Sequence, residues 1–285
     1  MVKTLYIIFN NFQSNLSKIK FNIFKNLNFR IYIFQIPYNL LKIQIPIKNN
    51  SIYYFLKFKN DNLIKLIKTK TNSKVVYEIL DYNYKSYNYI ESINKQILNV
   101  DYVILNNKFM SKNLNLTNIK HTTIYHEYDT RFPFNNKLTN NIYYLGLLHK
   151  ASFNNIMLKK YNIHLMSKNK SFNTMDYRGI HIDFVLPNNN QYILHTSTKL
   201  STALYTNSIF ITNKVPIYLE ILGDNYEFYF EDNLSNIENV IKKAKNTIAN
   251  KDLYNNYLIK MGPYKEMLSP VNILKCYNKF FESIV

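Results

Sequence analysis

One segment of this chain, residues 196–231, concentrates side chains that could bind a phosphate. It opens with three hydroxyl side chains and a lysine: Thr196, Ser197, Thr198 and Lys199. A short amphipathic helix is predicted over 196–204, and the first N–H groups of a helix have no partner within it and lie at its positive end. A lysine beside them completes an anion site, which favours a diphosphate. An ordinary Ser/Thr cap with a solvated lysine is the alternative that these residues leave open.

Four further residues are candidates for the same ligand. Glu220 could accept a hydrogen bond from a ribose or sugar hydroxyl, although a helix-initial glutamate stabilised by the helix dipole has the same appearance. Gly146 follows an apolar run and would let a ligand approach the backbone closely. His149 and Lys150 would then face the phosphate, unless they are exposed residues of a simple tight turn.

Candidates for acid–base chemistry lie in the first half of the chain. Glu78 and Asp81 stand at the end of one predicted strand, and His126 stands at the end of another. The end of a strand is a suitable place for the general base of a reaction. Capping and turn-forming side chains occupy the same kind of position.

The composition points to a globular protein with a basic excess. The chain has 285 residues, of which 47% are hydrophobic, and a net charge of +18. The abundance of Asn, Lys, Ile and Tyr is typical of translation from AT-rich codons. Codons for acidic residues also survive in AT-rich genes. The 36 Lys and Arg against 18 Asp and Glu therefore indicate a real excess of basic residues. This excess favours polyanionic partners such as nucleotides, nucleic acid or an anionic membrane surface.

The cysteine content and the hydropathy of the chain indicate in which compartment the protein is expected. The single Cys276 excludes an intramolecular disulfide and a zinc site built on cysteines. No apolar run approaches 18 residues, so no transmembrane helix is expected. The apolar start of the chain is interpreted as a first strand and not as a signal peptide. We therefore expect an intracellular, cytoplasmic protein in a reducing environment.

Short apolar runs alternate with amphipathic stretches along the chain, which predicts an α/β fold with parallel sheets. Strands are predicted over 4–9, 30–35, 52–58, 74–80, 101–106, 122–126, 141–146, 162–166, 180–186, 208–212 and 227–230. Eleven strands are too many for one ordinary parallel sheet, and the pattern is interrupted near Pro133. We expect two doubly wound, Rossmann-like domains over 1–132 and 133–265, with a final helix over 266–285. Gly262-Pro263 is expected to end the last regular helix of the second domain.

At this point the chain resembles a GT-B-fold glycosyltransferase, over residues 74–252. The segments that carry the resemblance are KVVYEILDYNY, NVDYVILNNKFMSKNL, IKHTTIYHEYDTRF, HIDFVLP and TSTKLSTALYTNSIFITNKVPIYLEILGDNYEFYFED. The last of these is similar to the donor-binding half of the family and is the most specific.

The resemblance implies two Rossmann-like domains facing across a cleft. The C-terminal domain would hold a nucleotide sugar, and the last helix would return to the N-terminal domain. Ser197, Thr198 and Lys199 would contact the diphosphate, Gly146 would line the donor cleft and Glu220 would contact the ribose or sugar. Ser201 stands at about the position where many relatives use a glutamate on the ribose, and the glycine-rich turn after the helix is replaced by residues 205–207.

The function that follows is transfer of a hexose from a nucleotide-diphosphate donor, a UDP-sugar, to an acceptor hydroxyl on a glycan or similar molecule. Amides and a lysine would stabilise the leaving diphosphate, so neither a metal nor a cofactor is expected. The basic charge keeps a DNA-modifying glucosyltransferase open as an alternative. A non-enzymatic binding protein on a decayed transferase scaffold is a second alternative. The absence of GxxxxGK[ST] and GxGxxG weighs against kinases and dehydrogenases.

Overall fold

A computed structural model describes residues 4–9, 20, 23–35, 45–56, 60–79, 89–130, 137–145, 155–166, 178–187 and 195–284. The chain divides into two compact units. Unit 1 comprises Met1–Tyr125 and Pro270–Val285, and unit 2 comprises His126–Ser269. Each is described by itself.

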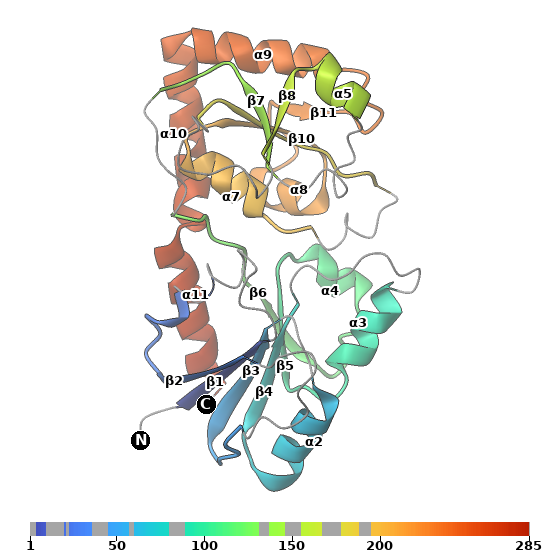
Figure 1. Cartoon of the computed structure of the whole chain (residues 1–285), viewed down its shortest axis with the longest axis vertical. Helices are drawn as coiled ribbons and strands as arrows, with labels where there is room; N and C mark the ends of the chain where they lie inside the picture. The colour runs from blue at the N-terminus through green and yellow to red at the C-terminus, as the bar shows by residue number, and fades with distance from the viewer. Residues whose placement is uncertain are drawn as a thin grey trace. The chain divides into compact units, whose positions relative to one another are not determined.

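Unit 1 is built on a sheet of six parallel strands in the order β2-β1-β3-β4-β5-β6. The strands are β1 (Thr4–Phe9), β2 (Arg30–Gln35), β3 (Ser51–Leu56), β4 (Lys74–Glu78), β5 (Tyr102–Leu105) and β6 (Lys120–Thr123). The helices are α2 (Asp61–Lys70), α3 (Tyr89–Ile97), α4 (Phe109–Asn113) and α11 (Pro270–Ser283). Figure 1 shows α2, α3 and α4 on one side of this sheet and α11 on the other, so that both faces are covered.

The central strands of unit 1 are mostly apolar because they are buried on both faces. All six residues of β3 are buried, as are five of the six in β1. One core cluster joins the face of these strands to the buried side of α11, through Ile273, Tyr277 and Phe281. On the opposite side, Asn60 caps α2 by accepting a hydrogen bond from the amide of Leu63 at 3.0 Å.

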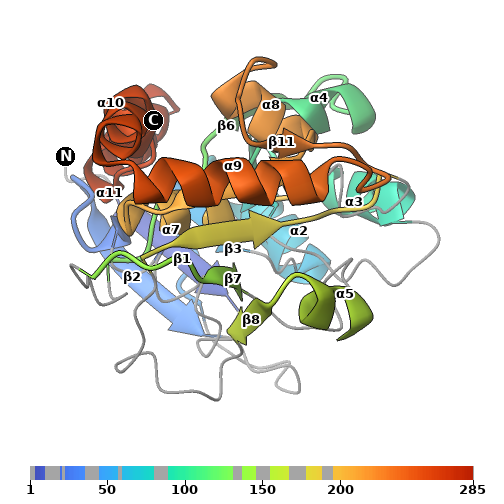
Figure 2. The same cartoon turned by 90° about the horizontal axis from the view of Figure 1, so that it is seen from above.

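Unit 2 is built on a sheet of five parallel strands in the order β11-β10-β9-β7-β8. The strands are β7 (Ile142–Leu145), β8 (Ile163–Met166), β9 (Ile180–Asp183), β10 (Ile209–Asn213) and β11 (Tyr229–Phe230). The helices are α5 (Asn155–Lys160), α7 (Thr198–Tyr205), α8 (Pro216–Leu222), α9 (Ile237–Ala249) and α10 (Lys251–Met267). Seen from above, α5 lies beside the edge strand β8, whereas α9 packs toward β10 and β11 (Figure 2).

Both sheets share one winding pattern. In each, the second strand of the unit lies outside the first, and the later strands continue on the other side of the first. The strand order therefore reverses between β1 and β3 in unit 1, and between β7 and β9 in unit 2. In open α/β sheets such a reversal opens a crevice beyond the carboxyl ends of the two strands, where ligands bind. The α/β class and the two parallel, doubly wound sheets are confirmed.

One predicted boundary is wrong. Helix α10 does not end at Gly262-Pro263 but continues through Pro263 to Met267. Met261 and Leu268, on either side of the proline, are both buried. Lys265 adds hydrogen bonds to the side chain of Asn207 at 2.7 Å and to the carbonyl of Tyr205 at 3.3 Å. Packing along the helix outweighs the hydrogen bond that proline removes, which costs a helix interior about 3 kcal/mol.

Within the described part of the chain, no helix combines the length and apolar character needed to cross a membrane.

Candidate functional site

The site is built around the start of α7, where the capping serine is turned away from the helix. Ser197 is fully buried, and its hydroxyl donates to the carbonyl of His126 and accepts from the amide of His126, both at 3.1 Å. It makes no capping bond to α7. The first intrahelical bond runs from the amide of Ser201 to the carbonyl of Ser197. Among the described residues, no acceptor meets the amides of Thr198, Lys199 and Leu200, so three N–H groups remain for a ligand.

Two hydroxyls assigned to the ligand from sequence have a different role. Besides Ser197, the buried Ser201 donates to the carbonyl of Thr198 at 2.9 Å and to the carbonyl of Glu127 at 3.3 Å. Together they fasten the segment at His126 and Glu127 to α7. In this structure both hydroxyls make contacts within the protein, and their predicted contact with a diphosphate stays a prediction.

Lys199 is paired with a carboxylate and is only partly exposed. Its Nζ forms an ion pair with Oδ1 of Asp183, donates to the hydroxyl of Tyr144 at 3.0 Å and lies 4.3 Å from the centroid of the Tyr144 ring. Asp183 has no exposed side-chain surface, whereas 20% of the Lys199 side chain is exposed. The buried Asp183 carboxylate therefore fixes the position of the Lys199 ammonium group, and part of the lysine side chain remains exposed at the surface.

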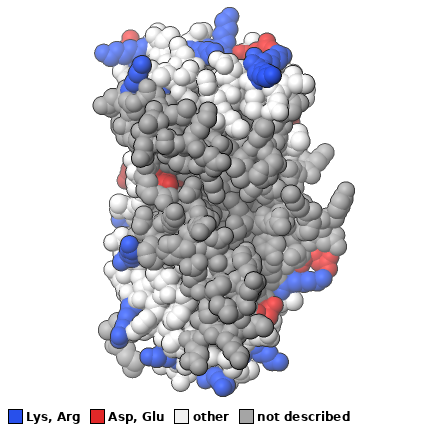
Figure 3. Space-filling view, in the orientation of Figure 1, with Lys and Arg blue, Asp and Glu red and all other residues white. Residues whose placement is uncertain are grey.

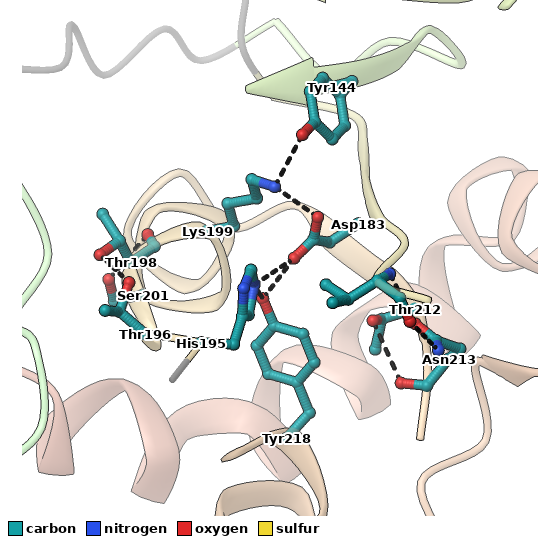
Figure 4. A network of polar contacts seen from close by, with 11 residues as sticks. Tyr144, Asp183, His195, Thr196, Thr198, Lys199, Ser201, Thr212, Asn213 and Tyr218 are labelled. Atoms are coloured by element: carbon teal, nitrogen blue, oxygen red, sulfur yellow. Dashed lines mark hydrogen bonds and ion pairs between the residues drawn. The ribbon is translucent and has the colours of Figure 1, made fainter. Parts of the chain in front are cut away.

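The other oxygen of Asp183 holds two more side chains (Figure 4). The hydroxyl of Tyr218 donates to Oδ2 at 2.7 Å, and Nε2 of His195 lies 2.6 Å from the same oxygen and 2.9 Å from the Tyr218 hydroxyl. The three groups lie within hydrogen-bonding distance of one another, and the single Nε2–H of His195 is shared between the carboxylate and the hydroxyl. We call Asp183, Lys199, His195, Tyr218 and Tyr144 the Asp183 cluster.

The contacts within the Asp183 cluster shift the pKa values of its members. Burial by itself would raise the pKa of Asp183, but the charge of Lys199, the charge that His195 carries when it is protonated and the hydrogen bonds from both side chains outweigh it and hold this pKa well below its usual range. Burial would lower the pKa of Lys199, and the Asp183 carboxylate outweighs that and raises it. Burial, and next the Asp183 charge, raise the pKa of Tyr218 well above its usual value. At neutral pH the carboxylate and the ammonium are therefore charged, and the phenol is not.

The Asp183 cluster lies at the point where the strand order of unit 2 reverses. Tyr144 belongs to β7 and Asp183 ends β9, and these two strands are neighbours. Lys199 bonds to both. The start of α7 thus stands at the crevice in which this kind of sheet binds its ligands.

The carboxyl ends of β9 and β10 are held together by one side chain. The side-chain nitrogen Nδ2 of Asn213 donates to the backbone carbonyl of Val185 at 2.8 Å and to the carboxylate of Asp232 at 2.6 Å. The side-chain oxygen Oδ1 of Asn213 accepts from the backbone N–H of Val185 at 3.2 Å. Asn213, labelled in Figure 4 beside Thr212, thereby joins the end of β10 to the segment that follows β9.

The remaining predicted residues have mixed positions. Thr198 accompanies the free amides, and its hydroxyl lies 2.8 Å from that of Thr196. Glu220 is partly buried on α8, the helix that carries Tyr218. His126 is buried at the α7 contact. Four predicted site residues lie outside the described residues: Asp81, Gly146, His149 and Lys150.

Glu78 is part of a closed core network. Its side chain is 1% exposed, lies 3.4 Å from Nζ of Lys20 and accepts from the hydroxyls of Tyr54 and Tyr277, the latter at 2.7 Å. This network gives Glu78 a structural role in unit 1, and its predicted catalytic role stays a prediction.

Sequence reasoning missed Asp183, His195 and Tyr144. The available signal was the acidic residue that ends the otherwise apolar β9, one loop before the hydroxyl-rich turn. The turn after α7, by contrast, keeps the backbone that glycine would give, because Asn207 adopts a positive φ of 53°. Among the described residues, no group of three His, Cys, Asp or Glu side chains could hold a metal ion.

A groove elsewhere in unit 2 is unrelated to this site. It has a volume of about 670 Å³ and lies between α9 and α10, lined by Lys242, Lys243, Asn246 and Lys260 among others. No member of the Asp183 cluster lines it.

Comparison with known proteins supports the fold. No family model matches this sequence, and no curated protein matches it either. Solved structures do. A glycosyltransferase from Rickettsia africae ESF-5 has a TM-score of 0.64 at 11% identity, covering 99% of this chain and 98% of that one. An E. coli trehalose-6-phosphate protein bound with UDP-2-fluoro glucose has a TM-score of 0.62 at 7% identity, with 99% of both chains covered. Anabaena Alr3699/HepE in complex with UDP has a TM-score of 0.58 at 7% identity, covering 99% of this chain and 100% of that one. The predicted GT-B fold is confirmed.

Proposed function

We propose that this protein is a glycosyltransferase that moves a sugar from a nucleotide-diphosphate donor to an acceptor hydroxyl. The observation that carries the proposal is the position of the unoccupied α7 amides and Lys199 at the strand reversal of unit 2. Two of the similar structures, bound with UDP-2-fluoro glucose and with UDP, support a nucleotide-sugar ligand for this fold. We propose a UDP-linked hexose as the donor.

The proposed chemistry uses charge that is already in place. As the bond between the sugar and the diphosphate breaks, negative charge grows on the phosphate oxygens. Amides fixed at a helix start and a lysine held by Asp183 stabilise this charge without having to reorganise. We therefore propose that the leaving group needs no metal ion.

The acceptor hydroxyl must lose its proton to a general base. Glu78 is enclosed in the core of unit 1, and His126 is 1% exposed at the α7 contact. Asp81, three residues beyond the end of β4, stays the candidate for this role. Its replacement by Asn should lower the turnover number while leaving donor affinity unchanged.

The decisive experiment is a panel of nucleotide sugars tested by thermal unfolding. A donor present at 100 times its dissociation constant stabilises the folded state by about 2.7 kcal/mol. We expect one UDP-sugar to raise the melting temperature by several degrees, and the same compound to be hydrolysed slowly or transferred. If no nucleotide sugar in the panel shifts the transition, the proposal fails. A shift without hydrolysis or transfer to any glycan acceptor would instead support the binding protein.

The net charge of +18 does not by itself favour DNA as the acceptor. On the face drawn in Figure 3, the Lys and Arg side chains of described residues lie in separate places near its margins and do not gather into one patch. A salt-sensitive gel shift with duplex DNA tests this alternative directly.

A further inference from the structure

The Asp183 cluster carries a charge balance that the proposed donor must change. Asp183 contributes one negative charge and Lys199 one positive charge, in direct contact. Tyr144 and Tyr218 are neutral partners of these two groups. The charge of Lys199 is therefore balanced by Asp183 before any ligand arrives, so that the pair offers a diphosphate a hydrogen bond from the ammonium group but no net charge.

His195 is the remaining group in the cluster that can alter this balance. It contacts the same carboxylate oxygen as Tyr218, and 14% of its side chain is exposed. Imidazole is the side chain whose charge ordinarily changes between pH 5 and 8. Among the described residues, the titratable groups in contact with it are Asp183 from β9 and Tyr218 from α8, and Lys199 from α7 lies across the carboxylate.

We propose that binding of a nucleotide-diphosphate sugar takes up one proton, and that His195 receives it. An anion beside the cluster favours the charged imidazole, and by reciprocity the charged imidazole favours the anion. With His195 protonated the cluster has a net charge of +1, directed at a ligand that carries two negative charges. This inference rests on the proposed function and adds to it a coupling between donor binding and pH.

The other members of the cluster do not take this proton. The pKa of Asp183 is displaced downward and that of Lys199 upward, both away from neutrality, by their mutual attraction. Both keep their charge across the range in which imidazole titrates. Affinity should therefore be highest where His195 is protonated, at low pH, and should fall as the pH rises.

Isothermal titration calorimetry tests the coupling with UDP-glucose and GDP-mannose as probes. Nucleotide sugars are preferable to nucleoside diphosphates because they have no phosphate group that titrates near pH 7. At pH 7.5 the observed enthalpy in HEPES and in Tris should differ, because these buffers release protons with different enthalpies. The slope against buffer ionisation enthalpy gives the number of protons bound, which we expect to lie clearly above zero. Between pH 6 and pH 9 the affinity should fall about tenfold, a coupling of the size usual between two linked binding events.

Two variants locate the proton. In His195→Gln the slope should vanish and the affinity should become independent of pH, equal to the wild-type value at pH 9. In Asp183→Asn the charge of Lys199 is no longer cancelled, so binding at pH 9 should be about tenfold tighter than in the wild type. His121→Gln, at an exposed histidine of β6 in unit 1, is the control and should behave as the wild type. Melting curves without ligand show that each variant is folded.

Separate results would overturn the inference and the proposed function. Tight binding by the wild type with no proton uptake, or uptake that persists in His195→Gln, overturns the inference and leaves the proposed function intact. Weaker binding by Asp183→Asn at every pH also overturns it, since the carboxylate would then act only as a scaffold. Failure of the wild type to bind any nucleotide sugar in the panel removes the proposed function and this inference with it.

Discussion

The buried pair of Lys20 and Glu78 in unit 1 gives the most direct test of the structure. Their side chains are 0% and 1% exposed. Nζ of Lys20 lies 3.4 Å from Oε1 of Glu78, donates to the hydroxyl of Tyr277 at 2.5 Å and stands 4.7 Å from the centroid of that ring. Replacement of Lys20 by Met fills a similar volume but leaves the Glu78 carboxylate buried without its cation.

The expected cost follows from what Glu78 retains. Removal of one partner of a buried ion pair costs about 3–5 kcal/mol. Glu78 still accepts from the hydroxyls of Tyr54 and Tyr277, so we expect the lower end, about 3 kcal/mol, for Lys20→Met. At about 2–4 °C per kcal/mol, the transition of unit 1 should fall by about 6–12 °C. Adding Glu78→Gln removes the uncompensated charge, so the double variant should recover most of this loss.

The assay is urea unfolding and thermal melting followed by circular dichroism. Lys65→Met, at an exposed lysine of α2, is the matched control and should change stability by less than about 0.5 kcal/mol. A loss below about 1 kcal/mol for Lys20→Met would refute the burial argument. A double variant as unstable as the single one would show that the loss arises from packing and not from the isolated charge.

Three further predictions concern unit 2. Lys199→Met should weaken binding of UDP-glucose about tenfold or more, because a charge-assisted hydrogen bond contributes about 1.5–3 kcal/mol. Lys242→Met, at an exposed lysine of α9, is the control. Equal affinity for both variants would exclude Lys199 from the site. Sugar transfer by protein treated with EDTA should continue at its full rate, since amides and Lys199 are proposed to stabilise the diphosphate; a loss that Mg²⁺ restores would contradict this. Because the pKa of Asp183 is lowered in the folded state, its contribution to stability is complete above the ordinary carboxyl pKa of about 3.9 and is lost as the pH falls below it. Urea unfolding at pH 6 and pH 3 should therefore show a smaller acid-induced loss in Asp183→Asn than in the wild type, and an equal loss would refute the assignment.

The architecture could be predicted because its signal is local. Strands buried on both faces, such as β3, are uninterrupted apolar runs, and parallel connections place amphipathic helices between them. The last helix was likewise predicted, over 266–285, and α11 covers Pro270–Ser283. The end of α10 was not, because a Gly-Pro pair is a local stop signal that contacts at Met261 and Leu268 override. The hydrogen bonds of Lys265 in the same stretch reach Tyr205 and Asn207, which lie 60 and 58 residues earlier in the sequence.

The site could be predicted only in part for the same reason. The hydroxyl-rich turn was found correctly as the start of α7, yet the direction of the Ser197 hydroxyl depends on His126, 71 residues earlier. The charge of Lys199 was counted as available because its partner, Asp183, lies 16 residues away across a loop. Spacing along the chain carries no information on either contact.

Each unit holds a buried carboxylate among the same types of side chain. The exposed fraction of those side chains distinguishes the two networks. Each places a carboxylate at the end of a parallel strand, with one lysine and two tyrosine hydroxyls: Glu78 in unit 1 and Asp183 in unit 2. Around Glu78 the lysine is fully buried, so the network can only stabilise the fold. Around Asp183 the side chain of Lys199 is 20% exposed, and His195, which also contacts the carboxylate, is 14% exposed. A substitution at Lys20 should therefore act on stability alone, whereas His195→Gln should act on donor binding, and a reversed pattern would show that exposure does not distinguish the two networks.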